Sequence, residues 1–324
     1  MNKVYTEQIL SALKAIPEII EKQETEIENK FNNSELRNSG KIYIAGDGAA
    51  FAAAYALKTA FVSFTEWTGN WVMPMTEREF AFDLSKDDLS FGKKFVVLLR
   101  SDDSNSEIMN TAELKCSENG CSYIAISSVG DGAFAYINLY ARGLVLAAAI
   151  GKAQGKLTDE QVSSIYEELN TYVSKLICAV SELEPKAAIV AEKMKNQVRN
   201  YETIGTGMDY AAAWLLRYIL YRTTGRVTTV EESEDYLHVN SLNVNPSEFG
   251  TFVYNSVDNP AYGRTITTIG NVEITDRFGV VITDGEESEI KCPIEIIKMP
   301  TTSTYPLKGL GMFIGGALIA DNLA

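Results

Sequence analysis

The stretch IAGDGAAFAAAYALKTAF, Ile44–Phe61, occurs a second time in altered form as TIGTGMDYAAAWLLRYIL, Thr203–Leu220. Both copies carry the pattern G-x-G-x-x-aromatic-A-A-A-aromatic, beginning at Gly46 and at Gly205. Each copy follows a short run with strand character and precedes an alanine-rich pattern with helical periodicity. The sequence therefore predicts two related halves, each with a strand, a glycine turn and a helix.

Two further pairs of segments follow in the same order. KFVVLLRSDDS, Lys94–Ser104, corresponds to TFVYNSVDN, Thr251–Asn259, and YIAIS, Tyr123–Ser127, corresponds to GVVIT, Gly279–Thr283. Apolar, β-branched runs that alternate with helical patterns are typical of parallel strands joined by crossover helices. We therefore predict an α/β fold of two tandem domains, each a mostly parallel sheet flanked by helices as an α/β/α sandwich.

The length of the chain, 324 residues, also favours two domains. Between the halves, Thr158 is the expected N-cap of a helix, and Pro185 in ELEPK is expected to separate that helix from a second one. The predicted parts are an N-terminal helical segment (1–38), a first domain (39–157), connecting helices (158–198) and a second domain (199–324).

Composition excludes several classes of partner. The formal net charge is −14 and the pI is near 4.7, so the surface repels nucleic-acid phosphates and anionic membranes. The opening residues MNKVYTEQIL lack the apolar run of a signal peptide, and the most apolar stretch, Gly143–Gly151, is shorter than the roughly 20 residues that span a bilayer. We expect a cytoplasmic protein with no nucleic-acid or membrane partner.

The sequence predicts no metal and no cofactor. Its only histidine is His238, and its cysteines lack C-x-x-C spacing, so no zinc site can be composed. Phe51 and Tyr210 replace the third glycine of a dinucleotide-binding turn, and no G-x-x-x-x-G-K-[ST] loop occurs. The thiols are expected to be reduced; they belong to Cys116, Cys121, Cys178 and Cys292.

Ligands of open α/β sheets bind beyond the carboxyl ends of the strands. The first glycine turn lies there and offers backbone N–H groups to an anion. The turn RSDDSNSE also lies there, and its hydroxyl and amide groups suit a phosphate or a sugar hydroxyl. The candidate substrate-binding residues are Gly46, Asp47, Gly48, Ser101, Asp103, Ser104, Asn105, Ser106 and Ser127.

A structural role for the serine turn is equally consistent with the sequence. A helix is predicted over Glu107–Asn119, with Ser104 or Ser106 as its N-cap and Glu107 in its first turn. Both roles use the same backbone amides, so one turn could serve both.

Taken together, these features resemble the sugar isomerase (SIS) domain family, from about Ser39 to the C-terminus. The layout is similar to the isomerase half of glucosamine-6-phosphate synthase and to fructosamine-6-phosphate deglycases. MTEREF, Met75–Phe80, resembles the acidic segment that the family carries before the second strand. EDYLH, Glu234–His238, resembles the stretch in which a carboxylate stands three residues before a histidine. The resemblance implies a sugar or sugar-phosphate ligand and a homodimer, and two-fold dimers are the commonest oligomers.

The resemblance also assigns catalytic roles within VEESEDYLHVN, Val230–Asn240. His238 would open the sugar ring or handle the oxygen proton, with Glu232, Glu234 or Asp235 as its orienter or as the base. A base needs a pKa near the working pH, and crowding of carboxylates raises the pKa of one of them. A solvated acidic loop with an exposed histidine is the alternative.

Four departures from the family pattern leave the function open. Ala49 and Ala50 replace hydroxyls, and Asp103 stands where a phosphate donor is expected, a repulsion of several kcal/mol. The helix Trp214–Arg226 lacks a carboxylate, and the end IADNLA lacks the family's lysine-bearing tail. Asp102 and Asp103 could instead pair with a substrate ammonium ion, which favours a deglycase.

The sequence therefore leaves two functions. The first is an enzyme, a phosphosugar isomerase or a fructosamine-6-phosphate deglycase, that binds a sugar phosphate or an amino-sugar derivative. The second is a non-catalytic protein that binds a carbohydrate derivative at a degenerate active site.

Overall fold

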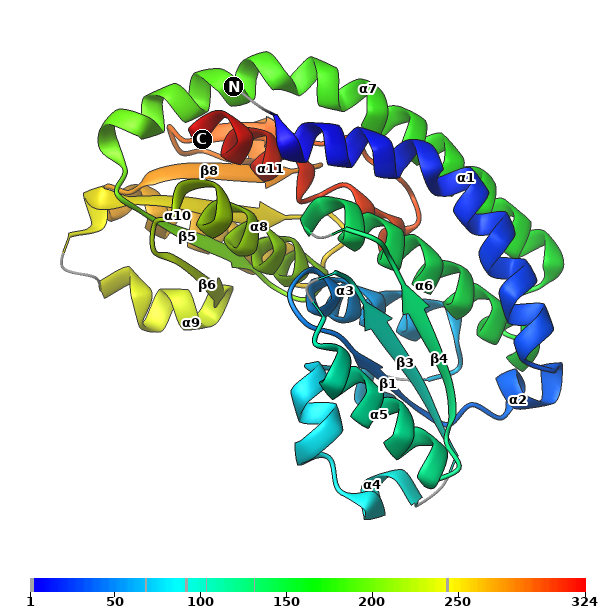
Figure 1. Cartoon of the computed structure of the whole chain (residues 1–324). Coiled ribbons are helices and arrows are strands. Elements are labelled where there is room, and N and C mark those ends of the chain that lie inside the picture. Colours follow the sequence, from blue (N-terminus) through cyan, green and yellow to red (C-terminus); the bar gives the residue numbers. More distant parts are fainter. Residues whose placement is uncertain (1–2, 68, 91–92, 103, 131, 243–244) are drawn as a thin grey trace. The chain divides into compact units, whose positions relative to one another are not determined.

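The computed structural model describes residues 3–67, 69–90, 93–102, 104–130, 132–242 and 245–324. The chain divides into two compact units. Lys14–Asn170 form the N-terminal unit, and Met1–Leu13 with Thr171–Ala324 form the C-terminal unit. Two long helices, α1 (Val4–Lys30) and α7 (Asp159–Gln197), contribute residues to both units (Figure 1).

The N-terminal unit is built on a four-stranded parallel sheet with the strand order β2-β1-β3-β4. On one side of this sheet α3 packs against α6, and α5 lies on the other side (Figure 1). The element bounds are α2 Asn33–Arg37, β1 Lys41–Ala45, α3 Ala49–Phe64, β2 Val72–Met75, α4 Lys86–Ser90, β3 Lys94–Arg100, α5 Ser106–Glu118, β4 Ser122–Ser127 and α6 Gly132–Gln154.

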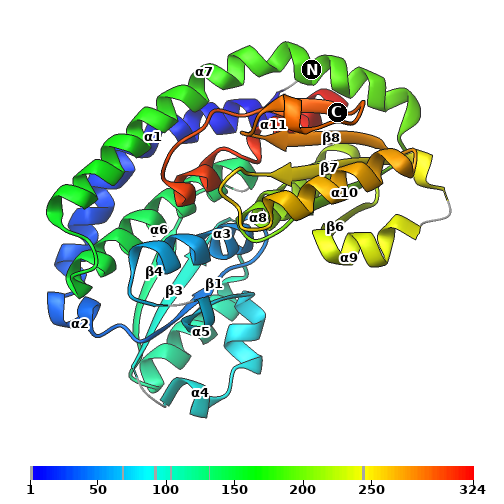
Figure 2. The ribbon, with the colours of Figure 1, turned by 180° about the vertical axis from the view of Figure 1, so that it is seen from behind.

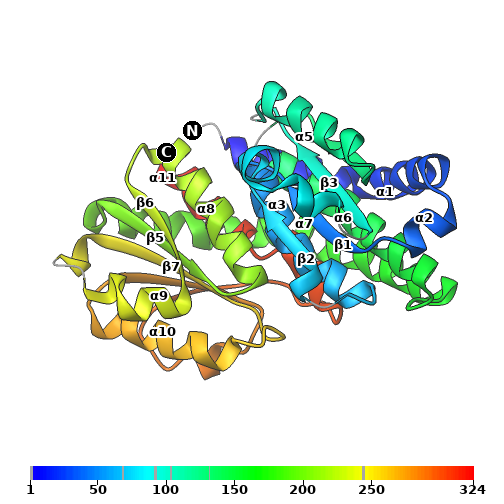
Figure 3. The same cartoon turned by 90° about the horizontal axis from the view of Figure 1, so that it is seen from below.

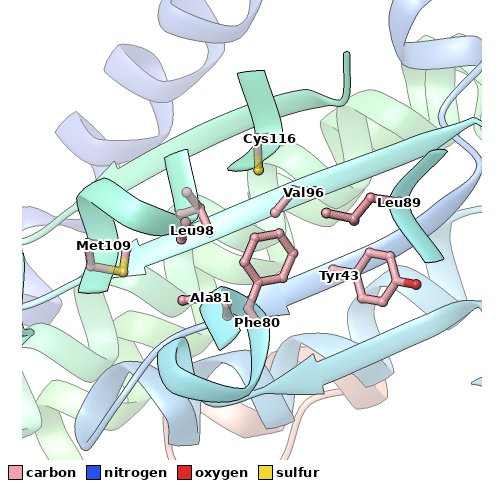
Figure 4. Close-up of a cluster of buried hydrophobic side chains, with 10 residues drawn as sticks. Tyr43, Phe80, Ala81, Leu89, Val96, Leu98, Met109 and Cys116 are labelled. Atoms are coloured by element: carbon pink, nitrogen blue, oxygen red, sulfur yellow. The ribbon is translucent and has the colours of Figure 1, made fainter. Parts of the chain in front are cut away.

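Both faces of this sheet are buried, as expected for parallel strands with crossover helices. Tyr43 of β1 and Val96 and Leu98 of β3 face a cluster that includes Phe80 and Met109 (Figure 4). The rings of Tyr43 and Phe80 meet edge to face with their centroids 6.1 Å apart. This cluster fixes the segment that follows β2 against α5.

The C-terminal unit is built on a five-stranded parallel sheet with the order β6-β5-β7-β8-β9 (Figure 2). Its first four strands follow the same order as those of the other sheet. Helix α10 packs on β7 and β8, and α9 packs against α10 and on β5 and β6. The element bounds are β5 Asn200–Gly205, α8 Met208–Thr224, β6 Thr228–Glu232, α9 Ser233–His238, β7 Phe249–Asn255, α10 Tyr262–Ile274, β8 Phe278–Thr283, β9 Glu295–Lys298 and α11 Ile314–Leu323.

Two parallel sheets flanked by helices confirm the predicted α/β class. The expected break at Pro185 is wrong, because α7 continues through it as one helix. Thr158 does cap this helix, since its hydroxyl accepts a hydrogen bond from the Gln161 amide at 3.2 Å. Strand β2 was not predicted. The domain limits 39–157 and 199–324 stay a prediction.

One helix of the described part of the chain, α6, is long and apolar enough to cross a membrane by length and composition. It extends well beyond the apolar stretch Gly143–Gly151 that the sequence suggested. However, 78% of its most apolar window is buried inside the protein, which is typical of a core helix.

Candidate functional site

The first glycine turn joins β1 to α3 at the carboxyl edge of the N-terminal sheet (Figure 3). Gly48, the N-cap of α3, has a φ of 55°, which favours glycine. A Cβ at Gly46 would lie 2.8 Å from the backbone of Ala50, so this position also requires glycine. Between them, the half-buried Asp47 projects from a tightly constrained turn.

Glu77, which is not among the predicted site residues, lies at the same edge just after β2. Its carboxyl group is fully buried, and neither oxygen has a hydrogen-bond partner among the described residues. Burial raises its pKa to about 7, and the nearby Asp47 carboxylate adds to the rise. The Ser104 hydroxyl, the Asn105 amide and the Arg100 charge oppose the rise. Neither Ser104 nor Asn105 meets the geometry of a hydrogen bond to this group.

The chain around Glu77 is held in a rare conformation. The Thr76 amide donates to the Glu79 carboxylate at 2.7 Å, and a π-helical turn follows over Glu79–Asp83. From α5, Lys115 Nζ donates to the carbonyl oxygens of Phe80 (2.8 Å), Ala81 (3.1 Å) and Leu84. π-Helical turns are frequent at functional sites. Here the turn, closed by Lys115, holds Glu77 in place.

Arg100 and Ser101 end β3 beside Glu77. Arg100 Nη2 lies 2.8 Å from Glu113 Oε1 of α5, which neutralises its charge. Arg100 Nε and the buried Ser101 hydroxyl have no hydrogen-bond partner within the described ranges, and Nη2 meets Glu113 as an ion pair without the geometry of a hydrogen bond. Buried polar atoms are almost always hydrogen-bonded. Orphan atoms on Glu77, Arg100 and Ser101 at one edge therefore indicate a place for a polar ligand.

The serine turn is bonded mainly to itself. The Ser101 amide donates to Ser104 Oγ at 3.1 Å, and the Ser104 amide donates to the Ser101 carbonyl at 3.0 Å. The N-cap of α5 is Asn105 and not Ser104 or Ser106, since Asn105 Oδ1 accepts from the amides of Glu107 (3.0 Å) and Ile108 (3.3 Å). Exposed Ser106 is the first residue of α5.

Of the two aspartates in this turn, the structure describes Asp102. Asp102 Oδ2 accepts a hydrogen bond from the Gly130 amide at 2.6 Å, so this carboxylate is occupied by the protein itself. Asp103 lies outside the described residues.

Ser127, at the end of β4, pairs in register with Arg100 of β3, and its side chain is exposed. Its carbonyl accepts a hydrogen bond from Arg142 Nη1 at 2.6 Å. It lines a pocket of about 430 Å³ with residues of α1 and α6, among them Gln23 and Asn138. Ser127 therefore lies between the end of β3 and this pocket, and its role in binding stays a prediction.

The predicted catalytic segment belongs to the C-terminal unit, and its carboxylates have other partners. Glu232 caps α9, accepting from the Glu234 amide at 2.8 Å, and it also accepts from the Thr206 hydroxyl. Glu234 accepts from Arg264 Nη2 at 2.9 Å and lies 3.6 Å from His238 Nε2. The His238 side chain is 76% exposed. The catalytic assignment of this segment stays a prediction.

The raised pKa that was expected of Glu232, Glu234 or Asp235 is found at Glu231. Burial is the main cause of a raised pKa at Glu231, and the Asp235 carboxylate adds to it. The Arg264 guanidinium lowers the pKa of Glu234. Asp235 itself is exposed. Of the four acids in this segment, Glu231 therefore has the environment that was expected of a base.

The second glycine turn is closed by the protein itself. Asp209 takes the place that Ala50 has in the first copy, and it is buried. Its Oδ2 accepts from the Ser256 amide at 2.8 Å and from Asn259 Nδ2 at 2.9 Å. Burial raises the pKa of Asp209, and these donors oppose the rise. Its carboxylate thus links the turn after β5 to the turn after β7.

Neither a protein-family model nor a curated protein matches the sequence. Solved structures do share the fold. The C-terminal domain of glucosamine-fructose-6-phosphate aminotransferase from Francisella tularensis matches with a TM-score of 0.75 and 12% identity, covering 98% of this chain and 95% of that one. Tagatose-6-phosphate ketose/aldose isomerase from Escherichia coli matches with a TM-score of 0.69 and 11% identity, covering 99% and 92%.

Glucosamine-6-phosphate deaminase from Thermotoga maritima matches with a TM-score of 0.59 and 12% identity, covering 95% of this chain and 92% of that one. At such identities these likenesses show the fold. The three proteins carry different activities, so the reaction has to be argued from the site.

Proposed function

We propose that this chain binds a sugar phosphate or an amino-sugar derivative at the carboxyl edge of the N-terminal sheet. The proposed reaction is a ketose–aldose isomerisation or the deglycation of a fructosamine derivative. The observation that carries the proposal is Glu77, a buried carboxyl group without a hydrogen-bond partner among the described residues and with a pKa raised to about 7. The orphan donors on Arg100 and Ser101 lie at the same edge and support a polar ligand.

The chemistry fits a carboxyl group of this kind. In an isomerisation, a base removes the proton from the carbon beside the carbonyl and returns it to the neighbouring carbon. The hydroxyl proton moves in the same direction, from the oxygen of the carbon that becomes the carbonyl to the oxygen of the former carbonyl, so atoms balance. Such a base must be both a good acceptor and a good donor, which requires a pKa near the working pH. At neutral pH, Glu77 is present in both protonation states.

Two further parts of the proposal follow from the resemblance to the SIS family. His238 opens the sugar ring, with Glu232, Glu234 or Asp235 as its orienter. The protein is a homodimer, which light scattering in solution tests directly. A monomeric mass would contradict the dimer and would leave the role of Glu77 untouched.

A second candidate function is binding without catalysis. The positions that follow the first glycine turn are Ala49 and Ala50, which are buried and offer no hydroxyl to a ligand. The Asp102 carboxylate and the Asn105 amide oxygen already accept hydrogen bonds from the protein. A chain that binds a sugar tightly and shows no turnover in either assay would have this function.

The decisive experiment compares two carboxyl-to-amide variants. Glu77→Gln keeps the shape of the side chain and removes its acid–base chemistry, so turnover should fall by about 10²- to 10⁴-fold. Glu79→Gln is the matched control, because a glutamine at this position can still bond the Thr76 amide and the side chain is exposed. Equal rates for Glu77→Gln and wild type would remove Glu77 from the mechanism.

A further inference from the structure

We propose that the ligand of this edge is an unphosphorylated amino sugar, such as a fructosamine, whose ammonium ion lies between Asp47 and Glu77. The inference rests on the proposed function, since it names the substrate class of the same site. An unphosphorylated amino sugar and a sugar phosphate would make different contacts with the serine turn. That turn would then contact a hydroxyl group, or nothing, in place of a phosphate.

Two backbone amides that would hold a phosphate are already used. Anions bind at helix N-termini through the first free backbone amides. At α5 the amides of Glu107 and Ile108 donate to Asn105 Oδ1, at 3.0 and 3.3 Å. The Ser104 hydroxyl accepts from the Ser101 amide at 3.1 Å. A phosphate bound to the Glu107 and Ile108 amides would have to displace the Asn105 side chain.

The first glycine turn offers no replacement. At the start of α3 the amides of Ala50 and Phe51 donate to the Asp47 carbonyl, at 2.9 and 3.3 Å. Ala49 and Ala50 are fully buried and carry no hydroxyl. This turn therefore adds the Asp47 carboxylate to the edge and no side-chain donor.

The local charge disfavours an anion. Arg100 is the cation at the end of β3, and its Nη2 is paired with Glu113 at 2.8 Å. In addition to burial, the Glu79 carboxylate raises the pKa of Asp47, which the Glu77 backbone amide opposes, and the Asp47 carboxylate raises the pKa of Glu77, which the Arg100 charge opposes. Two carboxyl groups with one neutralised guanidinium attract a cation at short range.

The placement of the two carboxyl groups is fixed by the strand register. Ala45 of β1 pairs with Met75 of β2, and the Gly46 amide donates to the Met75 carbonyl at 3.2 Å. Asp47 and Glu77 therefore each follow their strand by the same two residues. Burial is the main cause of the raised pKa of both carboxyl groups. The Glu79 carboxylate adds to the rise at Asp47, and the Asp47 carboxylate adds to the rise at Glu77. An ammonium ion between Asp47 and Glu77 would offset the free-energy cost of ionising these two buried carboxyl groups.

The orphan hydroxyl supplies the second kind of contact. Ser101 is 7% exposed, and its Oγ has no hydrogen-bond partner in the described part of the chain. Arg100 Nε is a second unused donor beside it. The Ser101 hydroxyl and the Arg100 Nε–H suit sugar hydroxyl groups, which both donate and accept.

Isothermal titration calorimetry with four probes at pH 7 tests the inference: fructosamine (1-amino-1-deoxyfructose), fructose, fructosamine 6-phosphate and inorganic phosphate. We expect fructosamine to bind at least about tenfold more tightly than fructose, because the ammonium ion gains charge-assisted contacts. We expect the 6-phosphate to bind no better than fructosamine, and inorganic phosphate not to compete. Glu77→Gln should lose the preference for the amine, and Glu79→Gln should keep it.

Proton release gives a readout that a merely structural role would not produce. Since the pKa of Glu77 is about 7, an ammonium ion that binds its ionised form displaces about half a proton at pH 7. Titrations of fructosamine in two buffers of different ionisation enthalpy measure this number. Glu77→Gln should release none, provided that its thermal unfolding shows a folded protein. The groups that also act on Glu77, Asp47 and Arg100, are unchanged in that variant.

The opposing outcomes are distinct. A 6-phosphate that binds at least about tenfold more tightly than fructosamine, or inorganic phosphate that competes with it, would overturn the substrate class and leave the proposed function standing. Binding of no sugar of either kind would overturn both. Fructose bound as tightly as fructosamine would overturn the role of the ammonium ion alone.

Discussion

Arg277 and Glu202 form an ion pair in which neither side chain is exposed, with Arg277 Nε 2.9 Å from Glu202 Oε2. The same oxygen of Glu202 accepts from the Thr251 hydroxyl at 2.8 Å. Arg277 Nη2 donates to the Asn240 carbonyl at 2.6 Å, and the guanidinium lies 5.4 Å from the ring centre of Tyr236. The pair therefore anchors α9 and the residues after it, and α9 ends at His238.

Loss of one partner of this pair should destabilise the protein strongly. Arg277→Met leaves the Glu202 carboxylate buried without a counter-ion, which costs about 3–5 kcal/mol of unfolding free energy. The double variant Glu202→Gln/Arg277→Met removes both charges and should recover a large part of that loss. Urea denaturation measures both values. A single variant as stable as wild type would show that the ion pair contributes nothing.

The burial of Glu77 should make stability depend on pH. Its pKa is about 7 in the folded protein, above its ordinary value of 4.5, so folding takes up a proton between these values. The stabilisation is therefore complete below pH 4.5 and is lost as the pH rises through 7, by up to about 3 kcal/mol.

Glu77→Gln should abolish this part of the pH dependence, and Glu79→Gln should keep it. Urea denaturation at pH 5 and pH 8 gives the difference for each variant. Asp47 and Asp209 also have raised pKa values and contribute to the pH dependence of the wild type. The contribution of Glu77 is therefore measured by the difference between the two variants. Parallel pH profiles for wild type and Glu77→Gln would contradict the environment described for Glu77.

Release of Arg100 should change the ligand preference of the site. Glu113→Gln removes the carboxylate that pairs with Arg100 Nη2. We expect the affinity for fructosamine 6-phosphate to rise by about fivefold, since a partly exposed ion pair is worth about 1 kcal/mol. Glu118→Gln, an exposed position near the end of the same helix, is the control and should have no effect. Calorimetry measures both affinities.

Exchange of the single histidine tests the role that the resemblance assigns to it. His238 is exposed and makes one distant contact, so His238→Ala should change the unfolding free energy by less than about 0.5 kcal/mol. If His238 opens the ring, turnover should fall by about 100-fold or more. Val239→Ala, its exposed neighbour, serves as the control. A rate equal to that of wild type would identify His238 as a surface residue.

The parallel sheets could be predicted because their central strands carry apolar runs that are buried on both faces. Strand β3 (KFVVLLR) and strand β8 (FGVVIT) are of this kind. Strand β2 (VMPM) is four residues long and contains Pro74, so it carries no such signal. Without β2, the edge position of Glu77 could not be inferred, although MTEREF had been noticed for its resemblance.

The candidate site could be predicted only in its location. The two turns at the carboxyl edge were identified from glycine and serine patterns, and the structure places Asp47 and Ser104 there with Glu77. The burial of Glu77 depends on Lys115, whose bonds to the π-helical turn join distant parts of the chain. The choice of Asn105 as the cap depends on its extended backbone, which neighbouring serines could equally have adopted.

The continuity of α1 and α7 limits how this protein can be dissected. The boundary between the units falls at Leu13 in α1 and at Asn170 in α7, in both cases inside a helix. A fragment cut at either point would end in a frayed helix. A fragment of residues 39–157 or 199–324 would lose α1 and α7, whose buried residues include Ile16 and Leu176. Halves produced separately should therefore aggregate, and limited proteolysis should release neither half intact.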